Sequence, residues 1–377
     1  MRTAIVVGGG IGGLGAAVGL RLTGWDVTVL ERRPSTARAG TGLVLQANGM
    51  RCLDELGLGD AVRAGGRPDA GGGTRTSDGR WLARIDGDIM AEILGTSAVG
   101  IHRAVLHGIL LDALPSGTVH TGATVTGASA DGTVTYRLDG VEHTRHADLV
   151  VGADGINSAV RAALWPENPG PARVGVIVWR GVTRDPWPGD IDVAISWGRG
   201  EEFGVVPLLD GRVYWFAAIN GPAPVTDEDP VAAVLRRFGG WHDPVPALVG
   251  ATDPATILHD DLRCLDVPLP TYVRGDVVLL GDAAHAMTPN LGQGANQALE
   301  DAVVLAATAG SPDRYDRDRR PRSQKVARVS RRIGRMSSAA NPVVVAARNA
   351  LMRVTPPRAA LRSMARYADW TPPELGR

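Results

Sequence analysis

Cysteine is nearly absent from this sequence of 377 residues, and its two cysteines, Cys52 and Cys264, show neither a CxxC nor a metal-binding spacing. This excludes a disulfide framework and a structural zinc site, and we predict no metal centre. No stretch approaches the 18 uninterrupted apolar residues of a membrane span. The first apolar run, residues 4–20, is rich in glycine and leads into a nucleotide-binding pattern. We therefore interpret it as structure and not as a signal peptide, which predicts a cytoplasmic protein.

Net charge is also absent, because 40 basic side chains balance 40 acidic ones, but the charge is unevenly placed. Residues 311–377 carry 16 Arg and Lys against 5 Asp and Glu. A nucleic-acid surface is disfavoured because these arginines lie on several faces of a predicted helix, so we expect a solvated helix beside an acidic body and no nucleic-acid partner. The length exceeds that of one small core and fits one large domain or two joined ones.

A βαβ unit with a glycine-rich turn opens the chain. Residues 4–7 and 27–30 are β-branched strands, and residues 14–22 have helical spacing. The turn between the first strand and the helix has the G-x-G-x-x-G pattern, and an acidic residue stands 18 positions after its last glycine; the residues are Gly8, Gly10, Gly12, Gly13 and Glu31. This pattern predicts a dinucleotide site in which Glu31 accepts from ribose hydroxyls, and it leaves NAD and FAD open.

A second glycine-rich stretch, residues 281–302, lies between a predicted buried strand at 276–280 and a predicted helix at 295–309. The strand delivers Asp282 to its end, where the carboxylate suits a polyol hydroxyl. The turn delivers unpaired backbone N–H groups to the helix start, which with the helix dipole form an anion site.

Residues 281–302 resemble the GD…P…GxG motif of the flavoprotein monooxygenases related to para-hydroxybenzoate hydroxylase, and among them most resemble the salicylate hydroxylase, urate hydroxylase and zeaxanthin epoxidase types. The resemblance implies that Asp282 binds the ribityl chain of FAD and that the helix start faces the flavin pyrimidine. It also implies a loop over the flavin ring at the residues predicted to be catalytic, Pro289, Asn290 and Gly292. The cofactor-binding residues predicted at the helix start are Gly292, Gln293, Gly294, Ala295 and Asn296.

Three further stretches match this family in the same order along the chain. Residues 31–34 and 40–49 resemble the segment that leaves the adenosine and passes beside the flavin, and residues 148–161 resemble the motif that contacts FAD and the nicotinamide cofactor. From this resemblance we predict further FAD-binding residues: Arg32, Val44, Arg103, Val125 and Asp154. A surface arginine at a helix start and a plain Asp-Gly turn are the alternatives for Arg103 and Asp154. His285 is predicted to be structural.

Four predicted strands without an intervening helix follow, at 174–182, 191–197, 203–208 and 213–219. They predict an inserted antiparallel sheet, and its side chains are candidates for an apolar substrate site: Trp179, Arg180, Trp197, Phe203 and Trp215. Plain core packing is the alternative for the aromatic residues.

The predicted fold is α/β: a Rossmann-type FAD-binding domain with an inserted antiparallel β-sheet substrate domain and a helical C-terminal segment. The predicted parts are residues 1–172 and 266–310 for the FAD-binding domain, 173–265 for the inserted domain, which also recruits residues 68–98, and 311–377 for the C-terminal helices.

The resemblance implies a single-component monooxygenase that reduces FAD with NADPH or NADH and hydroxylates an aromatic or heteroaromatic molecule through a flavin C4a-hydroperoxide. Alternatives are an epoxidase or another flavin oxidoreductase of this fold acting on an alkene or polyketide, a redox-inactive flavin protein and an NAD dehydrogenase. Urate is a doubtful substrate, because its hydroxylases place Asp where Asn290 stands and Arg near Glu201 and Glu202. A neutral or extended substrate is at least as compatible as a benzoate, and we expect a monomer or homodimer.

Overall fold

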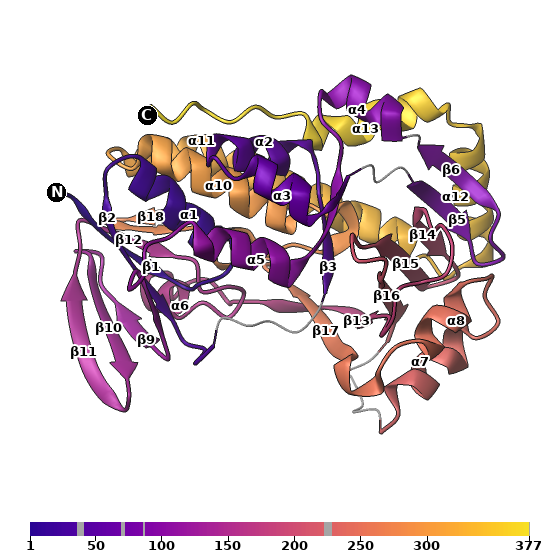
Figure 1. The fold of residues 1–377 in the computed structure, drawn as a ribbon, viewed down its shortest axis with the longest axis horizontal. Coiled ribbons are helices and arrows are strands. Elements are labelled where there is room, and N and C mark those ends of the chain that lie inside the picture. The colour runs from indigo at the N-terminus through magenta and orange to yellow at the C-terminus, as the bar shows by residue number, and fades with distance from the viewer. Residues whose placement is uncertain (36–40, 69–71, 86, 222–227, 377) are drawn as a thin grey trace.

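The computed structural model describes residues 1–35, 41–68, 72–85, 87–221 and 228–376. A six-stranded sheet with the order β18-β19-β12-β1-β2-β8 forms the first half of the molecule, and all its neighbours are parallel except β18 and β19 (Figure 1). Its strands are β1 (Thr3–Val7), β2 (Asp26–Glu31), β8 (Val119–Thr121), β12 (Leu149–Gly152), β18 (Val273–Arg274) and β19 (Val277–Leu279).

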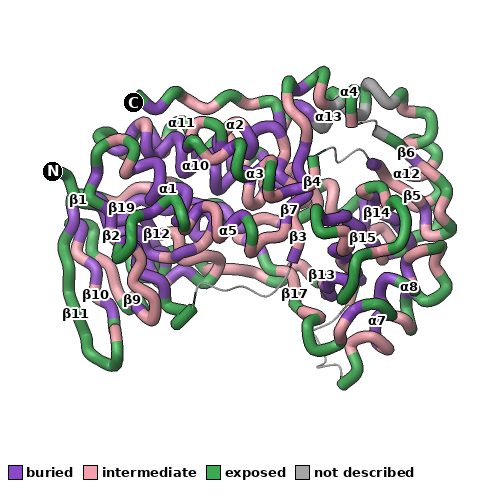
Figure 2. The backbone as a smooth tube through the Cα atoms, viewed as in Figure 1, coloured by how far each residue is buried: buried purple, intermediate pink, exposed green. Residues whose placement is uncertain are grey.

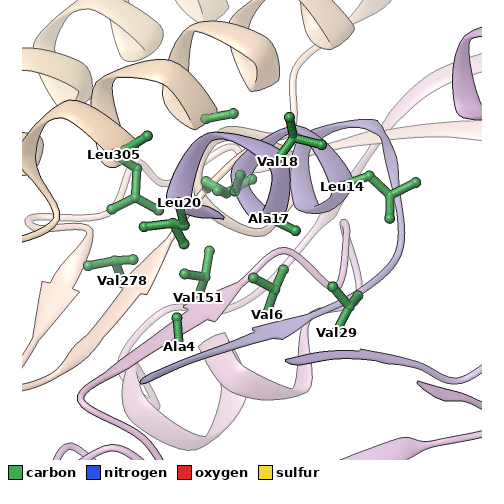
Figure 3. Packing of buried hydrophobic residues seen from close by; sticks show 14 of the residues in the cluster. Ala4, Val6, Leu14, Ala17, Val18, Leu20, Val29, Val151, Val278 and Leu305 are labelled. Carbon is green, nitrogen blue, oxygen red and sulfur yellow. The ribbon is translucent and has the colours of Figure 1, made fainter. Parts of the chain in front are cut away.

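Helix α1 (Ile11–Leu22) packs its apolar face on this sheet, where Leu14 and Leu20 lie over Val6 and Val151 (Figure 3). Its other face is built of small residues. A Cβ added at Gly19 would lie 2.8 Å from the Ala306 Cβ. Glycine therefore allows α1 and α10 (Gly294–Thr308) to approach closely, which aligns the two helices whose first turns border the site.

Other helices cover this half of the molecule. They are α2 (Ala47–Glu55), α3 (Gly59–Gly65), α5 (Arg103–Asp112), α6 (Ala159–Leu164), α9 (Asp282–His285) and the long α11 (Pro312–Ser337). Two small sheets complete it: β9 (Thr124–Ala128), β10 (Thr133–Leu138) and β11 (Val141–His146) form one, and β3 (Gly42–Leu45), β7 (Val99–His102) and β4 (Arg67–Pro68) form the other. Figure 2 shows that β11 is exposed along its length.

A seven-stranded sheet with the order β17-β13-β16-β15-β14-β5-β6 forms the second half. Its strands are β5 (Gly72–Thr76), β6 (Trp81–Ile85), β13 (Ala172–Val182), β14 (Val193–Trp197), β15 (Glu201–Pro207), β16 (Val213–Asn220) and β17 (Leu258–Cys264). Helices α7 (Pro230–Phe238) and α8 (Val245–Gly250) close a second core on one face of this sheet. The 3₁₀ turn η1 (Pro254–Thr256) leads into β17.

Helices α4 (Gly87–Leu94) and α13 (Pro357–Ala368) lie at the top of this half in Figure 1, and α12 (Pro342–Val354) lies below them at its right edge, beside β6. The chain thus runs from the first sheet into the second and back before ending in the helical segment. No helix among the described residues combines the length and apolarity needed to cross a bilayer, and the same residues hold no cluster of three or more His, Cys, Asp or Glu placed to bind a metal.

Most elements expected from the pattern are present, including the βαβ unit and the four strands of the inserted sheet. The alternating pattern of residues 118–129 and 134–138 predicts a hairpin, and this prediction is wrong for residues 118–129, which do not form one continuous arm. The chain breaks at Gly122, which has a φ of 76°, so β8 joins β2 in the parallel sheet and only β9 pairs with β10. Strand β5 pairs parallel to β14, so the inserted sheet is not purely antiparallel. Residues 69–71 and 86 of the recruited segment lie outside the described residues.

Candidate active site

The turn after β1 requires glycine at two positions. Gly8 has a φ of 107°, and a Cβ there would lie 2.4 Å from the Ala153 carbonyl oxygen. A Cβ at Gly13 would lie 1.9 Å from the Gly8 carbonyl oxygen. Both distances are far inside van der Waals contact, so only glycine permits this turn to lie against β12 and α1. The turn lies at the carboxyl ends of parallel strands, where open α/β sheets bind nucleotides.

Glu31 ends β2 beside this turn and is almost fully buried. Its Oε2 accepts from the Gly9 N–H at 2.7 Å and its Oε1 accepts from the Arg33 N–H at 2.9 Å. The carboxylate therefore holds the loop in shape, and each oxygen keeps a second lone pair for a ligand hydroxyl.

Asp154 follows β12 on the neighbouring strand end. Its Oδ2 accepts from the N–H groups of Ala159 (2.6 Å) and Val160 (3.2 Å) at the start of α6, whereas its Oδ1 is buried without a hydrogen-bond partner. Buried polar atoms in native proteins are normally paired. The orphaned Oδ1, on a residue that lines the cavity described below, marks a ligand position.

Asp282 begins α9 directly after Gly281, whose φ is 58°. Its side chain is exposed within the cavity, and no hydrogen bond to it is found in the described part of the chain. Arg103 begins α5 across the cavity, where burial lowers its pKa against the opposing effect of Asp282. The Arg103 Nε is buried and unpaired. These two side chains offer opposite charges to a polar ligand between them.

His285 is structural, as predicted. Its Nε2 lies 2.6 Å from Oδ2 of Asp301, and the same Oδ2 accepts from the Gly281 N–H at 2.8 Å. Burial alone would raise the pKa of Asp301, but His285 and the Arg319 guanidinium outweigh it and hold this pKa well below its usual value. The cluster fixes the turn that presents Asp282 and takes no direct part in the cavity.

The loop before α10 contains a 3₁₀ turn, η2 (Pro289–Leu291), and then Gly292 at a φ of 63°. Helix α10 begins without a side-chain cap, so its first N–H groups remain available. The loop is tied to α11: the Ser330 hydroxyl donates to the Thr288 carbonyl at 2.6 Å and accepts from the Leu291 N–H at 3.2 Å. Ser330, which sequence reasoning missed, thus sets the position of the loop.

Two predicted residues of the helix start turn their side chains away from the cavity. The Gln293 Nε2 donates to Gln46 Oε1 at 2.7 Å, and Asn296 Oδ1 accepts from the Gln46 N–H at 3.0 Å. The Asn296 Nδ2 donates to the carbonyl oxygens of Val44 and Gly292. These amides join the segment after β3 to the start of α10, so the two walls of the site are fixed to each other.

A single cavity of about 1070 Å³ lies between the two sheets. It brings together most of the predicted residues: Gly8, Gly10, Gly12, Glu31, Arg32, Val44, Arg103, Val125, Asp154, Arg180, Trp197, Asp282, Pro289, Asn290, Gly292, Gly294 and Ala295. Gly13, Gln293 and Asn296 support its walls without lining it. Gly40, at the start of one predicted stretch, lies outside the described residues.

Trp179, Phe203 and Trp215 do not line the cavity. They pack in the second core with α7 and α8. The alternative prediction of plain core packing is therefore the correct one for these three residues. The reason is the two-residue period of a strand, which sends neighbouring side chains to opposite faces. Arg180, Glu202, Tyr214 and Phe216, the sequence neighbours of these three residues, face the cavity instead. Only the tertiary structure shows which of the two alternating sets of residues faces the cavity.

Tyr214 and Arg180 form the middle of the cavity wall. Burial raises the pKa of Tyr214 to about 12, against the opposing effects of Arg180 and Arg103. The Arg180 guanidinium pairs with Asp260, so its charge is balanced, while its Nε is buried without a partner. A Cβ at Gly42 would lie 2.7 Å from the Tyr214 side chain, so β3 packs closely on this residue.

The residues present fit FAD. The glycine turn, the exposed Asp282, the unpaired Asp154 Oδ1 and Arg103 Nε, and the uncapped start of α10 line one continuous cavity that is long enough to join them. The pyrophosphate suits the N–H groups at the turn and the start of α1, and the polyol suits Asp282. The remainder of the cavity, beneath β14, β15 and β16, leaves room for a second molecule.

Comparison with known proteins agrees with this geometry. A family model described as FAD binding domain matches residues 1–330. Aurachin C monooxygenase/isomerase of Stigmatella aurantiaca is 37% identical over 93% of this chain and 94% of its own length. The 3-amino-4-hydroxybenzoate 2-monooxygenase of Streptomyces cremeus is 36% identical over 87% of this chain and 86% of its own. The structure of Klebsiella pneumoniae HpxO with FAD and uric acid has a TM-score of 0.88 and 30% identity, and covers 97% of this chain and 96% of that chain.

Proposed function

We propose that this chain, which belongs to the FAD binding domain family, is a single-component monooxygenase that uses NADH or NADPH and O2 to hydroxylate an aromatic or heteroaromatic small molecule. The observation that carries this proposal is the single cavity that joins the glycine turn and Asp282 to an apolar chamber under the second sheet. When bound, FAD supplies the redox and oxygen-activating chemistry. The chain's own residues hold it, exclude water and position the substrate.

The start of α10 favours negative charge at its end of the cavity. Its free N–H groups and about half a positive charge from the helix dipole stabilise an anion there. Gly294 and Ala295 line the cavity at this point, and their backbone brings the donors close because neither has a bulky side chain. A cofactor held here would gain negative charge on reduction, and the N–H groups at the start of α10 would stabilise that charge.

The loop at residues 288–292 shields the reaction from bulk water. Pro289 and Asn290 line the cavity, and the hydrogen bonds from Ser330 hold the loop in place from behind. Pro289 has no N–H, and its carbonyl accepts from the Gly292 N–H at 2.7 Å, so the backbone of this turn is held by its own hydrogen bond. We expect this wall to control how much of the consumed O2 ends in hydroxylated product and how much is released as hydrogen peroxide.

The nicotinamide cofactor has no Rossmann turn of its own, because the sequence contains one such motif and FAD occupies it. It therefore binds transiently near the turn at residues 154–157, which lines the cavity. We expect substrate to accelerate flavin reduction by an order of magnitude or more, through exposure of the flavin to the nicotinamide. A cytoplasmic location and a monomeric or homodimeric state remain predictions.

Three measurements on the purified protein test this function. A yellow protein with one FAD per chain is expected, as is substrate-stimulated NADH or NADPH oxidation in stopped-flow absorbance. Labelled O2 should place one oxygen atom in the product, and the other should leave as water. FAD reduction without oxygen incorporation for any aromatic compound would favour a different flavin oxidoreductase of this fold. Incorporation across an isolated double bond would favour an epoxidase.

A further inference from the structure

The cavity wall formed by the second sheet carries a pair of polar side chains, Trp197 and Glu202. Trp197 and Glu202 are directly opposite each other on the antiparallel strands β14 and β15, and both face the cavity. Side chains so paired have Cβ atoms about 4.5–5.5 Å apart. The pair therefore presents an indole N–H and a carboxyl group side by side to whatever occupies the chamber.

The Trp197 side chain is held firmly and has an unmet hydrogen bond. The residue is 8% exposed, and the Arg348 guanidinium lies 5.1 Å from its ring centre. Its Nε1 is buried and has no hydrogen-bond partner among the described residues. A buried donor without an acceptor is destabilising unless a ligand completes it, so this N–H indicates a position for a ligand acceptor.

The Glu202 carboxyl is also buried, and burial raises its pKa. Arg348 is the charge that opposes this effect, but its N–H groups donate to the carbonyl oxygens of Ser337 (2.9 Å), Met336 (3.2 Å) and Gly198 (3.3 Å). The Ser337 hydroxyl, which donates to the Gly334 carbonyl at 3.1 Å, and the Trp197 indole N–H both lie near the carboxyl and oppose this rise in pKa. The carboxyl is thus accessible from the chamber without being neutralised by a direct ion pair among the described residues.

We propose, resting on the function proposed above, that Trp197 and Glu202 select a neutral heteroaromatic lactam, whose ring carbonyl accepts from the indole N–H while its ring N–H donates to the carboxyl. The two protein groups match the two adjacent polar atoms of a lactam edge, one donor facing each acceptor. A planar ring placed on this edge extends toward apolar side chains that line the same chamber, namely Ile195, Ile333, Met336 and Met352.

The same pair disfavours carboxylate substrates. A carboxylate has no N–H to give to Glu202, and its negative charge would lie beside that of the carboxyl group in a chamber of low dielectric constant. Arg348 offsets this repulsion only in part, because its N–H groups donate to backbone carbonyl oxygens and not to the carboxyl. Glu202 is therefore a specificity-determining residue.

The test compares ligands on the FAD-loaded protein, with binding measured by the change in the flavin absorbance spectrum and by calorimetry. The probes are carbostyril, a bicyclic aromatic lactam, its N-methyl derivative, which keeps the carbonyl and loses the N–H, and the carboxylate quinaldate. Wild-type protein should bind carbostyril about tenfold tighter than N-methylcarbostyril, since each lost hydrogen bond to a charged group has an effect of this order. Quinaldate should bind most weakly.

Variants assign this discrimination to the two residues. Glu202→Leu should bind carbostyril and N-methylcarbostyril equally, and Glu202→Gln should gain affinity for quinaldate. Trp197→Phe should lose about tenfold affinity for both lactams and keep the ratio between them. Glu201→Gln is the matched control, because Glu201 faces Arg237 at 3.5 Å on the other side of the strand, and should change none of these ratios.

The outcomes separate this inference from the proposed function. Equal affinity of wild-type protein for the two lactams, persistence of the ratio in Glu202→Leu, or no carbostyril binding beside tight quinaldate binding would each overturn the lactam assignment. A protein that shows any of these results, yet binds FAD and oxygenates another compound, retains the proposed function. A protein without bound FAD loses the function itself.

Discussion

Two carboxylates beside the cavity, Glu31 and Asp282, have different roles despite their similar chemistry. Glu31 accepts from two backbone N–H groups, whereas Asp282 has no hydrogen bond within the described chain and is exposed in the cavity. Replacing a carboxylate that is hydrogen-bonded within the protein should change both the stability of the fold and the affinity for the ligand. Replacing a carboxylate that is free to bind the ligand should change the affinity alone.

Asp282→Ala should therefore lower FAD affinity by about tenfold or more and leave the melting temperature of the apoprotein unchanged. Glu31→Ala should lower both, because it leaves the Gly9 and Arg33 N–H groups without their acceptor, at a cost of about 1–3 kcal/mol in unfolding free energy. Fluorescence titration of apoprotein with FAD and circular dichroism melting would measure the two effects. Full FAD affinity in Asp282→Ala would refute its assigned role.

At the scale of elements, the first turn of α1 depends on contact between backbones. Gly13→Ala would place a Cβ 1.9 Å from the Gly8 carbonyl oxygen, so α1 must move away from the turn. We expect loss of most FAD binding and a lower melting temperature. Gly108→Ala in α5 is the control, because nothing lies within 4 Å of the added Cβ. It should stabilise the fold by about 0.5–1 kcal/mol.

The loop at residues 288–292 depends on α11 in a comparable way. Ser330→Ala removes the hydrogen bonds to the Thr288 carbonyl and the Leu291 N–H, and loosens the wall that shields the reacting centre. We expect FAD to remain bound while more hydrogen peroxide is released for each NADH or NADPH oxidised. Ser338→Ala is the control, since that hydroxyl bonds only to the Gly334 carbonyl of its own helix. An unchanged peroxide yield in Ser330→Ala would mean that the loop is held by other contacts.

At the scale of the whole molecule, a buried charge cluster joins α10 to α11. Arg319 is fully buried and donates to Glu300 and, at 2.7 Å, to Asp301. Arg319→Leu would leave Glu300 with only Arg322 and Asp301 with only His285 as partners among these side chains, so negative charge stays buried in excess. We expect a loss of about 3–5 kcal/mol in unfolding free energy by urea denaturation. Arg314→Leu removes only an exposed pair with Asp318 and should cost less than about 1 kcal/mol.

The same cluster gives the stability a pH dependence. His285 and Arg319 hold the pKa of Asp301 in the folded protein below its unfolded value of about 3.9. The contribution of Asp301 to the free energy of unfolding is therefore fully present above about pH 3.9, and it is lost as the pH falls toward the pKa of Asp301 in the folded protein. The difference in unfolding free energy between wild-type protein and Asp301→Asn should be constant from about pH 7 to pH 5 and narrow below about pH 4. Urea titrations of both proteins at several pH values would measure this difference in unfolding free energy. A difference that widens on acidification would contradict this sign.

The sequence by itself determined the local features of the nucleotide half. The G-x-G-x-x-G turn, the acidic end of β2 and the strand-turn-helix around Asp282 depend on contacts within short stretches, and glycine is the only residue that permits the Gly8 conformation. Helix and strand periods also depend on nearby residues, which is why the four inserted strands were predicted correctly. The resemblance to the flavoprotein monooxygenases rested on these same local motifs.

Only the tertiary structure decided which face of the inserted sheet became the substrate chamber. A strand shows two faces of alternating residues, and in β16 both faces carry large aromatic and aliphatic residues, so the pattern could not say whether Trp215 or its neighbour Phe216 faces the cavity. The choice follows from α7 and α8 covering one face while the cavity and β3 lie against the other. The pairing of Trp197 with Glu202 and the hold of Ser330 on a loop 40 residues earlier likewise arise from register and packing between distant segments, on which local sequence has no bearing.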